Sequence, residues 1–292
     1  MRRTGGPPIC YTEHMYAGVD VGGTKTLLAV LDDHGVIKET RKFPTPENYH
    51  HFVLELRHAA AHLEHRDFKA AGIGTTGTID RQHGIIIRTG TLPWQRVPLL
   101  ADVEKVLHCP AVIENDAKIA ALSESMLLKD RYRRVLYITI STGIGVGFVL
   151  GGKIDTTLND AGGSNMLVGH RGKLEIWEHF ASGKAIVERY GKRAEEIHDE
   201  ATWKAIVRDL RPGLLELIAI LEPEAVVIGG SVGTYFERYK HLLTTELKPY
   251  ETPALRMPVF LQASRPEEAV IFGCYDLAKA TFTKERRHAA AA

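Results

Sequence analysis

The stretch YAGVDVGGTKTLLAVL, residues 16–31, predicts two strands joined by a tight turn. Tyr16 to Val21 is a short apolar run that carries Asp20 near its end, and Thr26 to Leu31 is a second one. The Gly22-Gly23 pair between the two runs supplies the backbone freedom that a hairpin turn requires. The chain therefore opens with a β-hairpin whose turn is made of glycine.

The same pattern returns later in the chain. Residues 138–150, ITISTGIGVGFVL, again place a glycine turn between two apolar runs. Similarity between distant segments of one chain indicates internal repetition, so two related halves are expected.

Strands and helices alternate along both halves, which predicts an α/β architecture. Helices are expected near residues 47–65, 98–107, 117–128, 176–190, 202–221 (interrupted near Pro212-Gly213), 232–247 and 266–284, with strands at 36–40, 70–75, 111–113, 134–140, 144–150, 153–154, 225–228 and 258–261. The expected organisation is a disordered extension at 1–14, an N-terminal domain at 15–130, a C-terminal domain at 131–284 and a tail at 285–292, with the last helix able to pack back on the first domain.

The composition is that of an ordinary globular protein. The 292 residues include 37 Lys and Arg against 36 Asp and Glu, so the formal net charge of +1 argues against a nucleic-acid partner. No stretch has the length and apolar character of a membrane span, and the N-terminus lacks the apolar core of a secretory signal. The three cysteines, Cys10, Cys109 and Cys274, lie far apart without a CxxC pair, so neither a disulfide framework nor a cysteine-built zinc site is expected. A reducing cytoplasm is the expected location.

The segment Asp20-Val21-Gly22-Gly23-Thr24-Lys25 is the first candidate for chemistry. Two glycines let backbone N–H groups approach an anion closely, while Thr24 adds a hydroxyl and Lys25 a positive charge. Asp20 at the strand end has the hard oxygen ligands that suit hydrated Mg²⁺. The alternative is a plain hairpin turn that needs glycine and that Asp20 stabilises.

The second candidate is the run Ser141-Thr142-Gly143-Ile144-Gly145-Val146-Gly147. By itself this run also fits a strand with bulges. Two such loops, about 120 residues apart, would grip one polyphosphate from two sides. Neither loop has the GxxxxGK[ST] pattern of a single phosphate-binding loop or the GxGxxG pattern of a dinucleotide site.

The third candidate is Glu114-Asn115-Asp116-Ala117, ahead of a predicted helix. Asn and Asp are favoured helix N-caps, which is one interpretation. The other is a carboxylate that accepts a proton from a substrate hydroxyl as its oxygen attacks phosphorus. Gly229-Gly230, after an apolar strand, allows a flat ligand to lie against the backbone or simply permits a tight bend.

These motifs together resemble the ROK family of sugar kinases. The resemblance covers residues 16–282 and rests on DVGGTKT, AGIGTTGTID, TLPWQRVPL, ENDAKIAALSE, TISTGIGVGFVLGGKI, WEHFASGKAI and AVVIGGSV, which occur in the family's order. It implies the two-domain actin/hexokinase-like (ribonuclease H-like) α/β fold with an interdomain cleft. The sugar would bind deep in that cleft and ATP above it.

The resemblance also implies a role for each matching position. Asp116 would be the catalytic base, and the sugar-binding residues would be Asn115, Asp116, Glu178, His170 and Gly77. The nucleotide phosphates would lie against Gly22, Gly23, Thr24 and Lys25 on one side and Thr142 and Gly143 on the other, with Asp20 near Mg²⁺ and with Gly229 and Gly230 against the adenosine.

One segment departs from the family pattern. The family has a Glu-x-Gly-His segment at the sugar and often a cysteine-rich zinc loop, whereas residues 160–180 read DAGGSNMLVGHRGKLEIWEHF and contain no cysteine. Either Gly169-His170 takes the place of the Gly-His pair, or residues 164–166 do, with Asn165 in place of the histidine. In both alignments the glutamate is lost, which is expected to change which sugar hydroxyls are recognised.

The expected reaction is ATP- and Mg²⁺-dependent phosphorylation of a hexose hydroxyl, with glucose converted to glucose 6-phosphate. The alternatives are inorganic polyphosphate as donor, an N-acetylated hexosamine, mannose or fructose as acceptor, or a weakly catalytic sugar sensor. A sugar-responsive DNA-binding regulator is disfavoured, because such relatives carry a winged DNA-binding region ahead of the kinase-like part and here only 14 residues precede the first strand. The resemblance also makes a homodimer an expectation.

Overall fold

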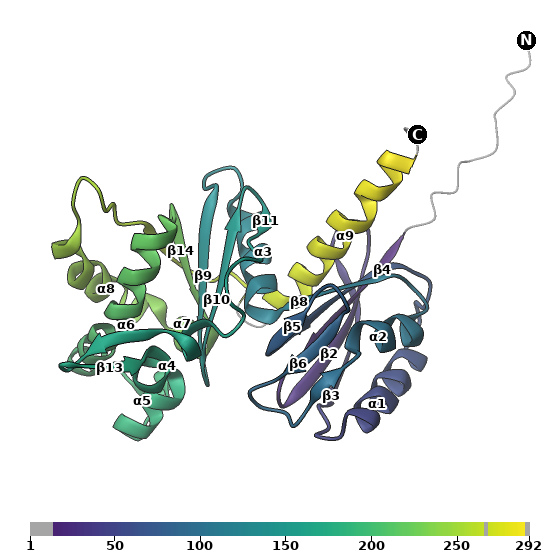
Figure 1. Ribbon diagram of the computed structural model, residues 1–292, viewed down its shortest axis with the longest axis horizontal. Helices are drawn as coiled ribbons and strands as arrows, with labels where there is room; N and C mark the ends of the chain where they lie inside the picture. Colours follow the sequence, from purple (N-terminus) through teal and green to yellow (C-terminus); the bar gives the residue numbers. More distant parts are fainter. Residues whose placement is uncertain (1–13, 266–267, 290–292) are drawn as a thin grey trace, which may run out of the picture.

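The computed structural model describes residues 14–265 and 268–289 and contains two five-stranded sheets, each at the centre of one lobe. Figure 1 shows the two lobes side by side with helices α3 and α9 between them. Most of the predicted extension at 1–14 and the last three residues of the predicted tail lie outside the described residues. Helix α9 runs as far as Ala289.

The first sheet has the strand order β3-β2-β1-β4-β8. The strands β1 (Met15–Val21), β2 (Lys25–Leu31) and β3 (Ile37–Pro44) form an antiparallel meander. The strands β4 (Phe68–Thr75) and β8 (Ala111–Asn115) extend the sheet parallel to β1. Val21 of β1 pairs with Thr75 of β4, which in turn pairs with Asn115 of β8. The carboxyl ends of three parallel strands therefore meet at one edge.

Both faces of strand β1 are buried, which explains its nearly continuous apolar sequence. Ala17 and Val19 pack in a cluster that includes Phe52 of α1 (Tyr49–Ala61) and Val103 of α2 (Leu99–Leu107). On the other face Tyr16 packs with Ile271 and Tyr275 of α9 (Ala269–Ala289). The last helix thus covers the first sheet from the far end of the chain.

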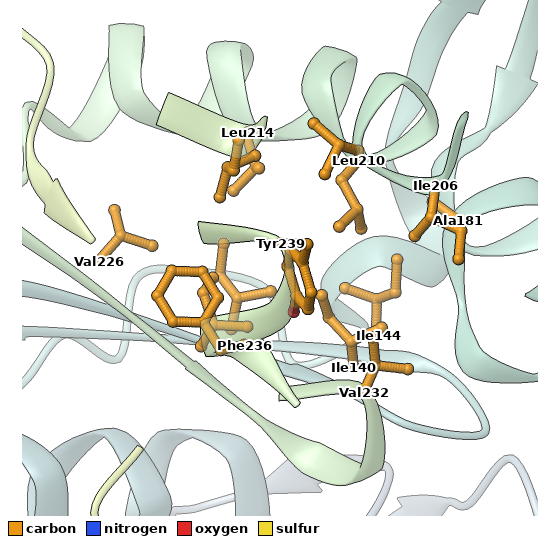
Figure 2. Close-up of a cluster of buried hydrophobic side chains, with 14 of the residues drawn as sticks. Ile140, Ile144, Ala181, Ile206, Leu210, Leu214, Val226, Val232, Phe236 and Tyr239 are labelled. Carbon is orange, nitrogen blue, oxygen red and sulfur yellow. The ribbon is translucent and has the colours of Figure 1, made fainter. Parts of the chain in front are cut away.

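The second sheet has the order β11-β10-β9-β14-β15 and repeats the meander-plus-parallel arrangement. Its strands are β9 (Arg134–Ile140), β10 (Ile144–Leu150), β11 (Lys153–Ile154), β14 (Ala225–Gly229) and β15 (Val259–Gln262). One face packs on α3 (Asp116–Leu128), and the other packs on α6 (Glu200–Leu221) and α8 (Lys240–Leu247). Figure 2 shows this second core, where Phe236 and Tyr239 lie among side chains of α6 and of the sheet.

Three predicted helices differ from the observed ones. The helix expected at 176–190 is two helices, α4 (Trp177–Ala181) and α5 (Gly183–Tyr190), because Ser182 caps the second one at Ala185 N. The helix expected at 232–247 is divided into α7 (Gly230–Gly233), a 3-10 turn and α8. The interruption expected near Pro212 is absent, since α6 is continuous there. Gly213 instead lets the indole of Trp177 pack on the helix, where a Cβ would lie 2.1 Å from its Cδ2.

Several short elements were not predicted from the sequence, because three or four residues are too few to show a recognisable alternation of apolar and polar side chains. A small sheet follows β4, and a hairpin follows β11: β5 (Thr78–Asp80), β6 (Ile85–Arg88), β7 (Gln95–Val97), β12 (Leu167–His170) and β13 (Lys173–Ile176). The 3-10 turns are η1 (Gly162–Asn165), η2 (Ala194–Glu196), η3 (Phe236–Arg238) and η4 (Lys248–Tyr250). Within the described ranges, no helix has the length and apolar character to cross a bilayer.

Helices α3 and α9 cross closely between the lobes. At the crossing a Cβ on Gly273 would lie 2.1 Å from the backbone oxygen of Ile119. Only glycine allows this approach, because backbone atoms cannot move aside as a side chain does.

We predict that Gly273→Ala destabilises the protein by about 1–3 kcal/mol, since the added methyl group forces the two helices apart. A loss of stability would be informative, because alanine inside a helix is otherwise more favourable than glycine by about 1 kcal/mol. Urea unfolding measures the change. Gly169→Ala is the matched control, because a Cβ there meets nothing within 4 Å. Equal stability of both variants would contradict the close crossing.

Candidate active site

The candidate site begins at the edge where β1, β4 and β8 end. The pairing of Val21 with Thr75 and of Thr75 with Asn115 places the segments that follow these strands next to one another. In open α/β sheets, ligands bind outside the carboxyl ends of the strands. The glycine turn after Asp20, the turn at Gly77 and the start of α3 therefore share one surface of the first lobe.

Asn115 caps helix α3, as one interpretation of its motif predicted. Its Oδ1 accepts hydrogen bonds from Ala117 N at 3.1 Å and Lys118 N at 3.3 Å. Its Nδ2 donates to the Gly77 carbonyl at 3.4 Å, which joins the two turns. Asp116 follows as the first helical residue, and its Oδ1 accepts from Ala117 N at 2.8 Å. The cap thus fixes where the carboxyl group of Asp116 lies.

Asp20 and Asp116 are half-buried and close enough to influence each other's charge. Burial, reinforced by the charge of Asp116 and partly offset by Lys25, raises the pKa of Asp20 to about 7. Burial also raises the pKa of Asp116 to about 6. The hydrogen bond from Ala117 N lowers this pKa, and the charge of Asp160 raises it. Because burial penalises the ionised form of both carboxyl groups, this edge favours a cation or a proton.

The turn between β1 and β2 is braced from outside. Gly22 N donates to Lys25 O at 3.1 Å, and Thr45 Oγ1 donates to Gly22 O at 2.8 Å. A Cβ on Gly23 would lie 2.2 Å from Thr91 Oγ1, so this position has no room for a side chain. Thr24 and Lys25 are exposed at the tip. The turn is held rigidly while its polar side chains face solvent.

The second lobe has a corresponding edge where β9 and β14 end. Thr139 pairs with Gly229, so the loop at 141–143 lies beside Gly229-Gly230. Gly230 has a left-handed backbone with φ of 77°, and a Cβ there would lie 2.5 Å from Ile140 O. Glycine is therefore required at this bend by both conformation and space. Thr142 is exposed at the tip of the neighbouring loop.

Glu178 lies against the 141–143 loop. Its Oε2 accepts a hydrogen bond from Ile144 N at 2.7 Å, and a Cβ on Gly143 would lie 2.4 Å from the same oxygen. Gly183 N, at the start of α5, donates to Ser141 O at 2.7 Å. Glu178 thus braces the second glycine loop, and its predicted contact with sugar stays a prediction.

The described contacts of His170 are with the β12–β13 hairpin, α4 and α6. Its Nδ1 contacts Glu175, its Nε2 lies 3.2 Å from Asp209 Oδ1, and its ring stacks on Phe180 at 3.8 Å between centroids. Arg189 completes this cluster by pairing with Asp209. The contacts described for His170 hold the β12–β13 hairpin to α6 and do not join it to Asn115 or Asp116.

Three charged residues beside Asp116 were not predicted. Asp160 forms ion pairs with Arg81 and with Lys118, and Arg81 also pairs with Glu114. The only local signal is Lys118, a charged residue inside the apolar run of α3 that is fully buried in the fold. A buried lysine needs a counter-charge, yet the sequence does not indicate which carboxylate supplies it.

A sequence model of the ROK family matches residues 16–281, which confirms the predicted resemblance. The chain is 28% identical over 258 residues to a glucokinase of Streptomyces coelicolor, with 74% of this chain and 81% of the relative covered. It is 29% identical over 237 residues to a putative fructokinase of Bacillus subtilis, with 75% and 77% covered. It is also 29% identical over 269 residues to an N-acetylmannosamine kinase of Salmonella typhi, with 80% and 89% covered.

Solved structures confirm the predicted two-domain actin/hexokinase-like fold. A ROK family glucokinase from Streptomyces griseus, in complex with glucose and AMPPNP, superposes with a TM-score of 0.75 at 25% identity, covering 92% of this chain and 99% of that one. A ROK hexokinase from Thermus thermophilus has a TM-score of 0.74 at 26% identity, with 92% and 99% covered. A ROK family transcriptional regulator shares the fold at 18% identity, with a TM-score of 0.73 and 90% and 78% covered.

We predict that Asp116→Asn stabilises the protein progressively as the pH rises. The folded-state pKa of about 6 lies above the ordinary value of 3.8, so wild-type stability falls as the pH passes from about 4 through about 6. The asparagine variant lacks this loss, which reaches about 1–3 kcal/mol above pH 7.

Urea unfolding between pH 4 and pH 8 measures this difference. Asp130→Asn, an exposed carboxylate just beyond the C-terminal end of α3, is the control. Parallel stability curves for Asp116→Asn and wild type would show that Asp116 is not under electrostatic strain.

Proposed function

Because the chain belongs to the ROK family, we propose that it is an ATP-dependent sugar kinase that phosphorylates a hexose, with glucose as its acceptor. The observation that carries the proposal is Asp116, fixed beside Asp20 at the start of α3. The relative from Streptomyces coelicolor is a glucokinase, and the similar structure from Streptomyces griseus holds glucose and AMPPNP.

Asp116 is proposed as the general base. The sugar hydroxyl oxygen attacks the terminal phosphorus of ATP, its proton moves to the Asp116 carboxylate, and ADP leaves. A base works best when its pKa is close to the working pH, and burial raises that of Asp116 to about 6. Since the Asn115 cap fixes the start of α3, the carboxyl group is oriented before the substrate arrives.

Asn115, Gly77 and Glu178 are proposed to bind the sugar. The bond from Asn115 Nδ2 to the Gly77 carbonyl ties these two positions together at the same edge as Asp116. Glu178 lies on the second lobe, so a sugar contacting both sides would draw the lobes together. His170 is also proposed to bind the sugar, although its ring nitrogens contact Glu175 and Asp209 in this structure.

The two glycine loops are proposed to hold the nucleotide. The polar tips at Thr24, Lys25 and Thr142 offer donors for phosphate oxygens, and the Gly229-Gly230 bend offers flat backbone for the adenosine. Asp20 would hold Mg²⁺, because burial and the charge of Asp116 raise the pKa of Asp20 to about 7, and a bound cation would favour its ionised form. When bound, the ion offsets the charge of the phosphates.

No group of three or more His, Cys, Asp or Glu side chains in 14–265 and 268–289 is placed to hold a metal. Mg²⁺ is commonly bound through one or two carboxylates together with substrate phosphates. Asp20 and the nucleotide would share the ion.

We predict that Asp116→Asn lowers the rate of sugar phosphorylation by about 10²- to 10⁴-fold, because it removes the proton acceptor. Nucleotide binding and the fold are expected to stay intact. Coupled ADP-release kinetics and nucleotide titration measure the two properties, with Asp130→Asn as the control. Turnover like that of the wild type would remove Asp116 from the mechanism.

We predict that ATP with Mg²⁺ and glucose gives the highest kcat/KM in a panel of donors and acceptors. The panel contains inorganic polyphosphate as the second donor, and mannose, fructose, N-acetylglucosamine and N-acetylmannosamine as other acceptors. A chelator is expected to abolish turnover, and added Mg²⁺ to restore it. A preference for another sugar would revise the acceptor, whereas sugar binding without any transfer would identify a sensor.

A further inference from the structure

The loop at 155–161 reaches from the second lobe to the first. It leaves β11 of the second sheet, and Asp160 near its end contacts the β5–β6 hairpin of the first lobe. Asp160 accepts hydrogen bonds from Ile79 N at 3.3 Å and from Arg81 Nη1 at 3.2 Å and Nη2 at 2.5 Å. The side chain of Asp160 is 4% exposed, so the carboxylate of this contact between the lobes is buried.

The guanidinium group of Arg81 donates hydrogen bonds to two carboxylates, those of Glu114 and Asp160. Nε donates to Glu114 Oε2 at 2.8 Å while the terminal nitrogens contact Asp160, so one planar group joins β8 of the first lobe to a loop of the second. A fork of this kind fixes orientation as well as distance, which a lysine would not do.

Lys118 binds the same carboxylate from helix α3. Its side chain is 0% exposed, and its Nζ lies 2.9 Å from Asp160 Oδ1 and 2.5 Å from Leu158 O. Burial would raise the pKa of Asp160, yet the hydrogen bonds from Arg81 and Lys118 hold it below the ordinary value. The loop is therefore anchored by two cations against a single ionised carboxylate.

The network includes sequence neighbours of the candidate base. Glu114 and Lys118 flank Asn115 and Asp116 in the sequence, and both belong to the network. Glu114 also accepts a hydrogen bond from Asn115 N at 2.6 Å. Movement of the loop would thus displace the residues proposed to bind and deprotonate the sugar.

We propose that Asp160 is a positioning residue that clasps the second lobe to Arg81 and Lys118 and so sets the cleft at the spacing that the sugar needs. This inference rests on the proposed function and adds to it a determinant outside the proposed sugar and nucleotide contacts. Closure of a kinase cleft excludes water from the reacting phosphate. Loss of the clasp is therefore expected to weaken sugar binding and to expose the reacting phosphate to water, and to change nucleotide binding less.

Arg81→Gln is the main test, because it removes the ion pairs of Arg81 with Asp160 and Glu114 and leaves Asp160 paired with Lys118. The KM for glucose is expected to rise about 10- to 100-fold, as for a misplaced binding group. The KM for ATP is expected to change by less than about threefold, and ATP hydrolysis without sugar is expected to increase. Arg81→Lys is expected to recover part of the loss.

A second variant tests the clasp if Arg81→Gln folds poorly. Lys118→Met with Asp160→Asn removes both buried charges together, leaves no unpaired lysine and still breaks the clasp. Arg211→Gln is the matched control, since Arg211 pairs with Glu246 within the second lobe. This control is expected to keep both KM values.

Equal changes in the two KM values, or a loss of stability with unchanged kinetics, would overturn the proposal and leave the network a structural role. Small-angle X-ray scattering gives a readout that needs no activity. Without sugar, Arg81→Gln is expected to have a larger radius of gyration than wild type and Arg211→Gln, and equal radii would also overturn the clasp. A wild-type protein that transfers no phosphate refutes the proposed function instead, and the scattering result then decides the clasp alone.

Discussion

The burial of two carboxyl groups at one edge of a parallel sheet is the constraint on which the rest of the site depends. Strand pairing brings Asp20 and Asp116 together although they are distant in the chain, and burial then raises the pKa of both. A protein that only needed to be stable would not keep such a pair, because each ionised group raises the cost of the other. The strain is consistent with a site that receives a cation and accepts a proton.

Glycine provides a second condition, which is the close packing of neighbouring residues against the two turns. Gly23 and Gly230 lie where any side chain would collide with Thr91 or with Ile140. Thr45 donates a hydrogen bond to Gly22 O at the first turn, and Glu178 accepts one from Ile144 N beside the second. Both loops therefore combine rigid backbone with exposed polar tips, which suits the positioning that phosphoryl transfer requires.

Two contacts between the parts that carry these edges differ in kind. Helices α3 and α9 cross at Gly273, and Asp160 contacts Arg81 across the lobes. The crossing is a close backbone contact, whereas the ion pair joins side chains that can separate. A fixed crossing with a separable clasp is a natural basis for opening and closing a cleft.

The sequence by itself determined the family, the α/β class and the local chemistry of the site. The glycine turns and the Asn115 cap are set by residues within a few positions of one another, so patterns in the chain identify them. Tertiary structure alone decided that Glu178 braces Ile144, that His170 belongs with Glu175 and Asp209, and that Asp160 finds Arg81 and Lys118. These pairs are side-chain contacts made by packing, and one sequence contains no signal that couples such partners.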